Sequence, residues 1–376
     1  MAKLLSLWIL SALLLGGLSQ EAQARTFAST HGPLNLETLQ NELHHPWGMA
    51  FLGPKRVLVT ERRGKLVLLN LRKKTRRSIG GLPKIVADGQ GGLLDVAIGP
   101  NFETNRWVYL SYAGGKKRSK STHVGRGQLK DGKLQNFQVL FRAGPKMSGP
   151  HHFGSRLVFS KDGHLFISLG DRGKRELAQD PSNHAGSMIR ILPNGKIPKD
   201  NPFVNKKGFN PKIYSYGHRN MQGAAMHPTT GAIWAHEHGP KGGDEVNIIL
   251  PGRNYGWPKT TYGVNYSGST ITQDKTLPGI QSPVLHWTPS IAPCGMAFVT
   301  GSLFPKWNGD LLVGALKHRK LVHLTIRGEA VTQQEILLED LGERIRDVEV
   351  GPDGAIYLLT DDFNGRLLRL SPTNPN

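Results

Sequence analysis

The chain has 376 residues and is strongly basic, with a formal net charge of +20, which indicates attraction to anionic partners. Its densest basic runs, over residues 72–77 and 116–120, contain no aromatic side chains. We interpret these runs as solvated loops, which excludes nucleic acid as the partner. The lone cysteine, Cys294, cannot form an internal disulfide, so the fold must depend on its own core.

The N-terminus has the pattern of a secretory signal peptide. Lys3 is followed by an apolar run over residues 4–18 and by small residues near Ala24, where we predict cleavage. The run is short for a membrane helix, and no later stretch approaches the roughly 20 apolar residues that a span requires. We therefore expect a mature chain of residues 25–376 that is periplasmic or secreted and has no membrane span. A retained N-terminal anchor is the alternative.

Six segments of the mature chain repeat one pattern, in which an alternating apolar strand leads through a turn to a second such strand. They cover residues 48–70, 94–114, 155–173, 222–240, 295–326 and 346–370. Turns of the Asp-Gly type between alternating strands indicate hairpins, and repeats about 50 to 75 residues apart are long enough for four-stranded sheets. We predict an all-β fold, a single six-bladed β-propeller domain with four-stranded antiparallel blades and little helix. A β-sandwich is the alternative, but it does not explain the recurrence.

The first candidate for chemistry is a histidine and aspartate pair. His151 and His152 directly precede a predicted strand, and Asp171 follows the strand that returns from it. A carboxylate beside an imidazole fixes its tautomer and makes it a stronger base. The alternative is that His152 caps a loop while Asp171 binds backbone amides.

The next candidates are a polar turn and an acidic segment. Arg219 and Asn220 supply a forked cation and an amide, which suit a carbonyl or carboxylate oxygen, although an arginine in a turn can also be structural. Between Glu237 and Glu245, carboxylates and backbone carbonyls surround glycines, a donor set that suits calcium better than zinc. His236 and His238 are too few ligands for zinc.

The last candidates for chemistry are three cationic side chains. Lys317 ends a predicted strand, and Arg344 and Arg346 share one face if their segment is a strand. Entering one channel, they would repel one another unless an anion lay between them. A polycarboxylate ligand would supply that anion. The alternative is that all three are surface cations of a basic protein.

Eight motifs occur in a fixed order: GQGGLLD at 89–95, HHFGSRL at 151–157, SLGDRG at 168–173, GHRNMQG at 217–223, EHGP at 237–240, GGDE at 242–245, NYGWP at 254–258 and RIRD at 344–347. With this ordered set the chain resembles the soluble glucose/sorbosone dehydrogenase family, which depends on pyrroloquinoline quinone (PQQ), and most closely its bacterial aldose sugar dehydrogenases. The resemblance runs from about His45 to Leu370 and implies an enzyme that uses PQQ and calcium to oxidise aldose sugars.

The resemblance also implies roles for residues. His152 would be the general base, Asp171 its orienting partner, and Arg219 would stabilise charge on the quinone oxygen. The residues implied around the quinone are Gln90, His151, Arg219, Asn220, His238, Lys317, Arg344 and Arg346. Carbonyls of Gly239 and Pro240 would hold the activating calcium, and a second, structural calcium would bind Glu245, Tyr255 and Tyr266.

The implied reaction removes a proton from the anomeric hydroxyl and passes hydride to the quinone, which leaves a lactone. Electrons would then go to an external acceptor, a quinone or a cytochrome, and we expect a monomer. His151 and His238 replace an Asp and a Gln of the glucose-oxidising members, which favours a broader range of aldoses. The alternatives are a calcium-dependent propeller lactonase, disfavoured by the three cations, and a non-catalytic binding module.

Overall fold

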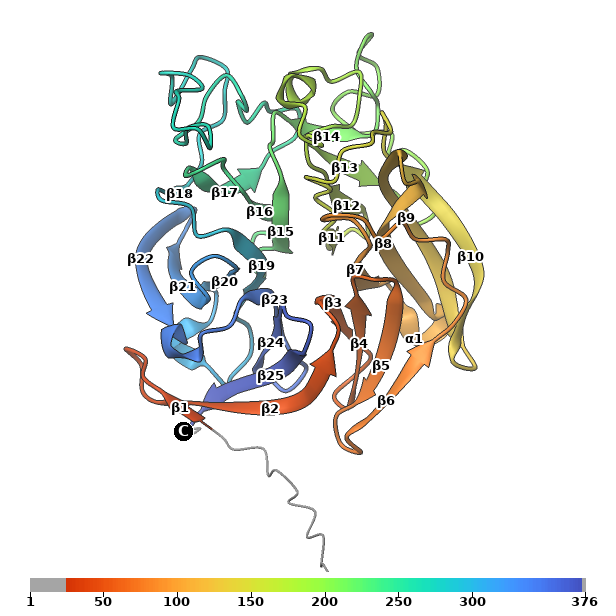
Figure 1. The fold of residues 1–376 in the computed structure, drawn as a ribbon, viewed down its shortest axis with the longest axis vertical. Helices are drawn as coiled ribbons and strands as arrows, with labels where there is room; N and C mark the ends of the chain where they lie inside the picture. Colours follow the sequence, from red (N-terminus) through yellow and green to blue (C-terminus); the bar gives the residue numbers. More distant parts are fainter. Residues whose placement is uncertain (1–24, 374–376) are drawn as a thin grey trace, which may run out of the picture.

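The computed structural model describes residues 25–373, which form a ring of six antiparallel β-sheets around a central channel (Figure 1). Each sheet is one blade, and its innermost strand faces the channel. The six-bladed β-propeller predicted from the repeats is therefore confirmed. The predicted signal peptide over residues 1–24 lies outside the described residues.

Five blades follow one another along the chain, each with four strands counted from the channel outwards. Blade 1 contains β3 (Pro46–Phe51), β4 (Arg56–Glu61), β5 (Lys65–Asn70) and β6 (Thr75–Ile79). Blade 2 contains β7 (Leu93–Ile98), β8 (Trp107–Lys116), β9 (Ser119–Lys130) and β10 (Lys133–Arg142). Blade 3 contains β11 (Leu157–Phe159), β12 (Leu165–Ser168), β13 (Ser187–Ile191) and β14 (Ile213–Tyr216). Blade 4 contains β15 (Met221–Met226), β16 (Ile233–Glu237), β17 (Asp244–Ile249) and β18 (Leu285–Trp287). Blade 5 contains β19 (Pro293–Phe298), β20 (Leu311–Ala315), β21 (Lys320–Arg327) and β22 (Ala330–Leu337).

Blade 6 closes the ring with strands from both ends of the chain (Figure 1). Its inner strands are β23 (Ile345–Val350), β24 (Ile356–Thr360) and β25 (Gly365–Pro372), and its outer strands are β2 (Leu34–Leu43) and β1 (Arg25–Phe27). In the pairing of β2 with β25, Leu36 lies opposite Leu370. The short β1 makes this blade five-stranded, one strand more than the repeat pattern predicted.

Asp-Gly turns join the innermost strand to the second strand in the two closest copies of the repeat. Gly163 and Gly354 occupy these turns with φ of 79° and 76°, a backbone conformation that glycine adopts without steric cost. In the part of the chain that the structure describes, helix is confined to α1 (Phe102–Asn105) and three 3₁₀ segments, Arg175–Gln179, Pro305–Trp307 and Glu339–Leu341. Over residues 25–373, no helix has the length and apolar character needed to cross a membrane.

The hydrophobic core is divided among the junctions between blades. Alternating strand residues give each sheet two apolar faces, and a separate buried cluster fills each of the six junctions. Leu58 and Leu110 pack between blades 1 and 2, for example, and Val299 and Leu358 between blades 5 and 6. The central channel is thus not filled by these clusters.

Candidate active site

A cavity of about 310 Å³ lies at the channel end where the innermost strands begin. All six blades contribute to it. Its lining consists of Trp47, Arg62, Gln90, Leu94, Phe153, Gly154, Asn220, Gln222, His238, Ala292, Leu316, Arg344, Arg346 and Asp361. Five of these residues were predicted from the sequence, namely Gln90, Asn220, His238, Arg344 and Arg346. The volume falls at the lower end of the roughly 300–1,000 Å³ typical of ligand pockets.

The predicted histidine and aspartate pair is present beside this cavity. His152 precedes β11 and Asp171 follows β12, and the antiparallel register of Leu157 with Ile167 returns both residues to the same end of the blade. The distance from His152 Nδ1 to Asp171 Oδ1 is 2.6 Å. Gly170 permits this approach, because a Cβ at that position would lie 2.3 Å from the His152 carbonyl oxygen.

Further contacts fix both partners of the pair. The Gly173 amide donates to Asp171 Oδ1 at 2.7 Å, and Trp257 Nε1 donates to Oδ2 at 2.8 Å. The His152 amide donates to Oε1 of Gln90 at 2.7 Å, which links the pair to the cavity wall. Both carboxylate oxygens and the histidine backbone are therefore held in place, and the Trp257 contact was not predicted.

The charge states of the pair suit a base and its orienting partner. Burial alone would raise the pKa of Asp171, but the hydrogen bond from His152 and its other partners hold that pKa below its usual value. Burial lowers the pKa of His152, although Asp171 opposes this effect. At neutral pH, Asp171 is ionised and His152 is neutral. Because an ionised carboxylate can only accept a hydrogen bond, Nδ1 of His152 carries the ring hydrogen and donates it to Asp171. The free lone pair of His152 therefore lies on Nε2.

Arg219 and His238 lie next to this pair, and of the two only His238 lines the cavity. Arg219 Nη1 donates to the carbonyls of His238 and Gly239, each at 2.9 Å, and the Arg219 carbonyl accepts from the Asp171 amide at 2.8 Å. His238 Nε2 lies 2.8 Å from the Pro293 carbonyl, which can only accept, so Nε2 carries the hydrogen and Nδ1 is an acceptor. Burial lowers the pKa of His238 to about 3, so the imidazole is neutral.

The opposite wall is cationic but contains an acid that the sequence interpretation missed. Arg62, Arg344 and Arg346 line the cavity around Asp361. Asp361 forms ion pairs with Arg346 and, at 3.4 Å, with Arg344, and it also lies 3.2 Å from His45 Nδ1. Burial alone would raise the pKa of Asp361, but Arg346 and the other partners lower it. Because this wall has three guanidinium groups and one carboxylate, its net charge is positive.

Arg62 and Asp361 share a position in the repeat that could have revealed them. Each directly follows the second strand of its blade, β4 or β24, as His238 follows β16 and Asp171 comes shortly after β12. The second strands of the blades therefore deliver polar side chains to one face of the ring. Lys317 and His151, predicted near the same ligand, are exposed and do not line the cavity.

A smaller cavity of about 10 Å³ adjoins Arg219 and His238. Its lining includes Glu237, Gly239, Glu245 and Tyr255, whereas Pro240 and the 73 % exposed Tyr266 are not part of it. Burial and the neighbouring Glu237 raise the pKa of Glu245 well above its usual value. Over residues 25–373, no group of three or more His, Cys, Asp or Glu side chains is arranged to hold a metal ion, so a cation here would depend on backbone carbonyls.

Comparisons with known proteins agree on one family. Residues 43–369 match the glucose/sorbosone dehydrogenase family. The chain is 45 % identical to the aldose sugar dehydrogenase YliI of Escherichia coli over 347 residues, 91 % of this chain and 94 % of that protein.

Solved structures give the same result. The apo crystal structure of the soluble aldose sugar dehydrogenase from Escherichia coli superposes with a TM-score of 0.88 at 44 % identity, covering 90 % of this chain and 99 % of that one. The PQQ-bound aldose sugar dehydrogenase from Streptomyces coelicolor superposes with a TM-score of 0.74 at 26 % identity, covering 90 % and 98 %.

Proposed function

This chain belongs to the glucose/sorbosone dehydrogenase family and is an oxidoreductase that acts on sugar donors; from that premise we propose that it oxidises aldoses to lactones with bound PQQ and calcium. The proposal extends to a periplasmic location, based on the signal peptide pattern in residues 1–24, and to an external acceptor, a quinone or a cytochrome. The observation that carries it is the 2.6 Å pairing of His152 with Asp171 beside a cavity with a cationic wall.

The residues around the cavity fit a quinone that carries several carboxylates. Arg62, Arg344 and Arg346 together outweigh Asp361 in charge, and the Nε of Arg346 is buried with no hydrogen-bond partner. A buried donor without a partner is costly unless a ligand satisfies it. Guanidinium groups bind carboxylates through two parallel hydrogen bonds. We therefore assign the carboxylate-binding role to this wall, with Lys317, which directly follows the cavity-lining Leu316, as an additional exposed cation.

The chemistry is divided between the cofactor and the chain. When bound, PQQ supplies the two-electron acceptor for the hydride of the sugar's anomeric carbon. His152 Nε2 takes the proton of the anomeric hydroxyl, since Nδ1 is engaged by Asp171. Asp171 keeps the ring in that tautomer and stabilises the imidazolium that forms, as a buried carboxylate does beside a catalytic histidine.

Arg219 would stabilise negative charge on an oxygen of the ligand. Its Nη1 is fixed by the carbonyls of His238 and Gly239, which sets the plane of the guanidinium and directs its remaining N–H groups. Fixed donors aimed at a developing charge need no reorganisation during reaction. Asn220 lines the cavity, where its Oδ1 accepts from the Gly154 amide at 3.2 Å, and its amide nitrogen is assigned to the ligand.

Calcium is assigned to two positions by the chemistry of the donors. Carbonyls of Gly239 and Pro240 would hold the activating ion near Arg219. Glu245, with carbonyls of Tyr255 and Tyr266, would hold a structural ion near the small cavity, which Glu237 and Glu245 both line and where Glu237 raises the pKa of Glu245. Oxygen donors of this kind suit calcium.

The test is dye-linked oxidation of several aldoses by the purified mature protein, with PQQ and calcium added together, singly or not at all. We expect activity only with both, and we expect His152→Ala to reduce kcat by about 10²- to 10⁴-fold. His164→Ala is the matched control, because His164 pairs with Asp162 at the same 2.6 Å but lies in the β11–β12 turn, away from the cavity. Absence of quinone binding to the wild-type protein would refute the proposal.

A further inference from the structure

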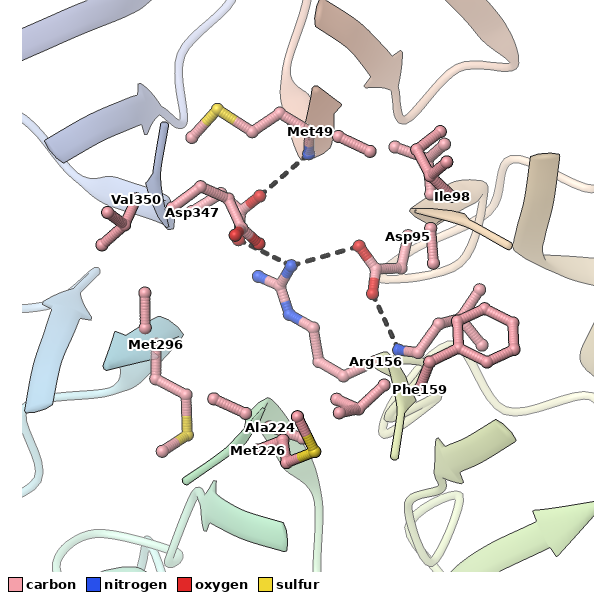
Figure 2. A pocket seen from close by; sticks show the side chains of 18 of the residues that line it. Met49, Asp95, Ile98, Arg156, Phe159, Ala224, Met226, Met296, Asp347 and Val350 are labelled. Carbon is pink, nitrogen blue, oxygen red and sulfur yellow. Dashed lines mark hydrogen bonds and ion pairs between the residues drawn. The ribbon is translucent and has the colours of Figure 1, made fainter. Parts of the chain in front are cut away.

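The side chain of Arg156 extends between Asp95 and Asp347 at the centre of the ring (Figure 2), and its contacts reach all the other blades. It belongs to blade 3, directly before β11, and is only 4 % exposed. Its contacts in the other five blades are the Trp47 ring at 4.3 Å, Asp95 Oδ1 at 3.3 Å, the Gln222 carbonyl at 2.8 Å, Cys294 Sγ at 3.9 Å, Asp347 Oδ1 at 2.7 Å and the Arg346 carbonyl at 3.1 Å. One guanidinium therefore connects every innermost strand.

Two buried carboxylates pair with one nitrogen of this guanidinium, Nη1. Figure 2 shows it between Asp95 and Asp347, which also accept from the backbone amides of Leu157 at 2.8 Å and Met49 at 2.9 Å. Burial alone would lower the pKa of Arg156, but Asp347 and Asp95 hold it above its usual value. The group thus stays charged, and its planar fork fixes the spacing of the blades it joins.

Arg156 separates two cavities. On one side lies the cavity of about 310 Å³ already described, whose lining includes Trp47, Gln222 and Arg346 but not Arg156 itself. On the other side, where the innermost strands end, a cavity of about 450 Å³ is lined by Arg156, the acids Asp95, Asp347 and Glu349, Thr300 and apolar side chains. Arg156 therefore contacts three residues of the first cavity, Trp47, Gln222 and Arg346, from outside that cavity. It also closes the channel between the first cavity and the second.

We propose that Arg156 is a positioning residue for the quinone, which holds Trp47, Gln222 and Arg346 as the floor of the cofactor cavity. This inference rests on the proposed function, because it presumes that the cavity takes PQQ. A lysine at this position keeps the charge but cannot make the forked contacts to several blades at once. The floor residues would then no longer be fixed, and the quinone would lose contacts that a rigid cavity offers.

The test compares Arg156→Lys with the wild-type protein in quinone titrations without sugar, followed by absorbance and tryptophan fluorescence. We expect at least a tenfold weaker affinity for PQQ and an altered absorption band of the bound quinone. With quinone at saturation, we expect the KM for the sugar to stay unchanged, because in the proposed reaction the sugar contacts His152 and not the residues that Arg156 holds. Arg126→Lys is the matched control, since Arg126 stacks on Trp107 at 4.1 Å and donates to the Pro193 carbonyl far from both cavities.

A second pair of variants covers the case in which Arg156→Lys does not fold. Asp95→Asn and Asp347→Asn each remove one of the two ion pairs at Arg156 Nη1 and leave the other carboxylate paired with it. Each should weaken quinone binding by a smaller factor than Arg156→Lys, with circular dichroism unchanged. Quinone affinities within twofold of wild type in folded variants would overturn this inference alone. If the wild-type protein binds no quinone, both this inference and the proposed function are refuted.

Discussion

The Nδ1 atom of His152 lies 2.6 Å from the Oδ1 atom of Asp171, while Trp257 and the Gly173 amide hold the same carboxylate. Three donors from different loops thus converge on one buried acid. The arrangement leaves the imidazole neutral, fixes its tautomer and directs Nε2 away from the carboxylate. A base of this kind works without prior deprotonation at neutral pH.

Asp171→Asn should lower kcat and move the pH profile toward acid. The pKa of His152 lies below its usual value of about 6.5 because of burial, so activity is lost as pH falls through that lowered pKa. Asp171 opposes the burial effect, and its removal should lower the pKa of His152 further. We expect the acid limb of kcat to shift to lower pH and kcat to fall by about 10²- to 10⁴-fold.

The measurement is kcat against pH with saturating quinone, calcium and sugar. Asp162→Asn, which removes the partner of His164 at the same 2.6 Å, is the control and should leave both kcat and the profile unchanged. An acid limb that moved to higher pH in Asp171→Asn would contradict the assigned role of the carboxylate.

The cationic wall predicts unequal effects of its members on quinone affinity. Arg346 is buried and paired with Asp361, and truncation of a buried, hydrogen-bonded charge costs about 2–5 kcal/mol in binding. Arg346→Met should therefore weaken quinone binding by roughly 30-fold or more. Lys317 is exposed and outside the cavity lining, so Lys317→Met should change the affinity by about threefold at most. Equilibrium titration of both variants checks the order, and an equal loss in both would contradict it.

Calcium should stabilise the protein through Glu245. Free calcium at about 100 times its Kd would add about 2.7 kcal/mol to the free energy of unfolding, and Glu245→Gln should abolish most of the resulting rise in Tm. Since the folded-state pKa of Glu245 is raised by burial and by Glu237, its ionisation costs stability as pH rises above the unfolded value of about 4.3.

Without calcium at neutral pH, Glu245→Gln should therefore melt above the wild type. Glu349→Gln is the control, because Glu349 is another carboxyl with a pKa raised by burial but lines the cavity at the opposite channel end. It should gain stability without calcium and keep the calcium response. Thermal melts with calcium and with chelator distinguish the two variants.

The fold was predictable because each repeat unit consists of strands that are adjacent in the sequence. Alternating strands around turns such as Asp162-Gly163 and Asp353-Gly354 recur through the mature chain, and six copies determine the number of blades. The closure by β2 and β25 was not predictable in the same way. Strand pairing between the two ends of the chain depends on how the ring curves, and the local pattern of β2 carries no information about its partner.

The site was predictable where side chains follow strand ends within one motif, as with His152 and Asp171. It was missed where the contact joins blades far apart in sequence. Arg156 was visible in its motif, but its position on the axis arises only when six strands converge. Asp361 was missed because it was one of two consecutive acids after β24, and only the packed ring shows that it faces Arg344 and Arg346.

Asp361 should act as an internal competitor of the anionic ligand. Its carboxylate pairs with Arg346 and Arg344, and its pKa is lowered by those cations despite burial, so it is ionised at neutral pH. Asp361→Asn removes one negative charge from the wall, and at an effective dielectric constant near 20 such a charge contributes up to about 4 kcal/mol at close range. We expect quinone binding to tighten by roughly fivefold or more and to become more sensitive to salt, while the quinone-free protein loses stability because the arginines repel one another. Titrations at two ionic strengths and melts without quinone check both effects. Weaker binding in Asp361→Asn would show instead that Asp361 serves mainly to orient Arg346.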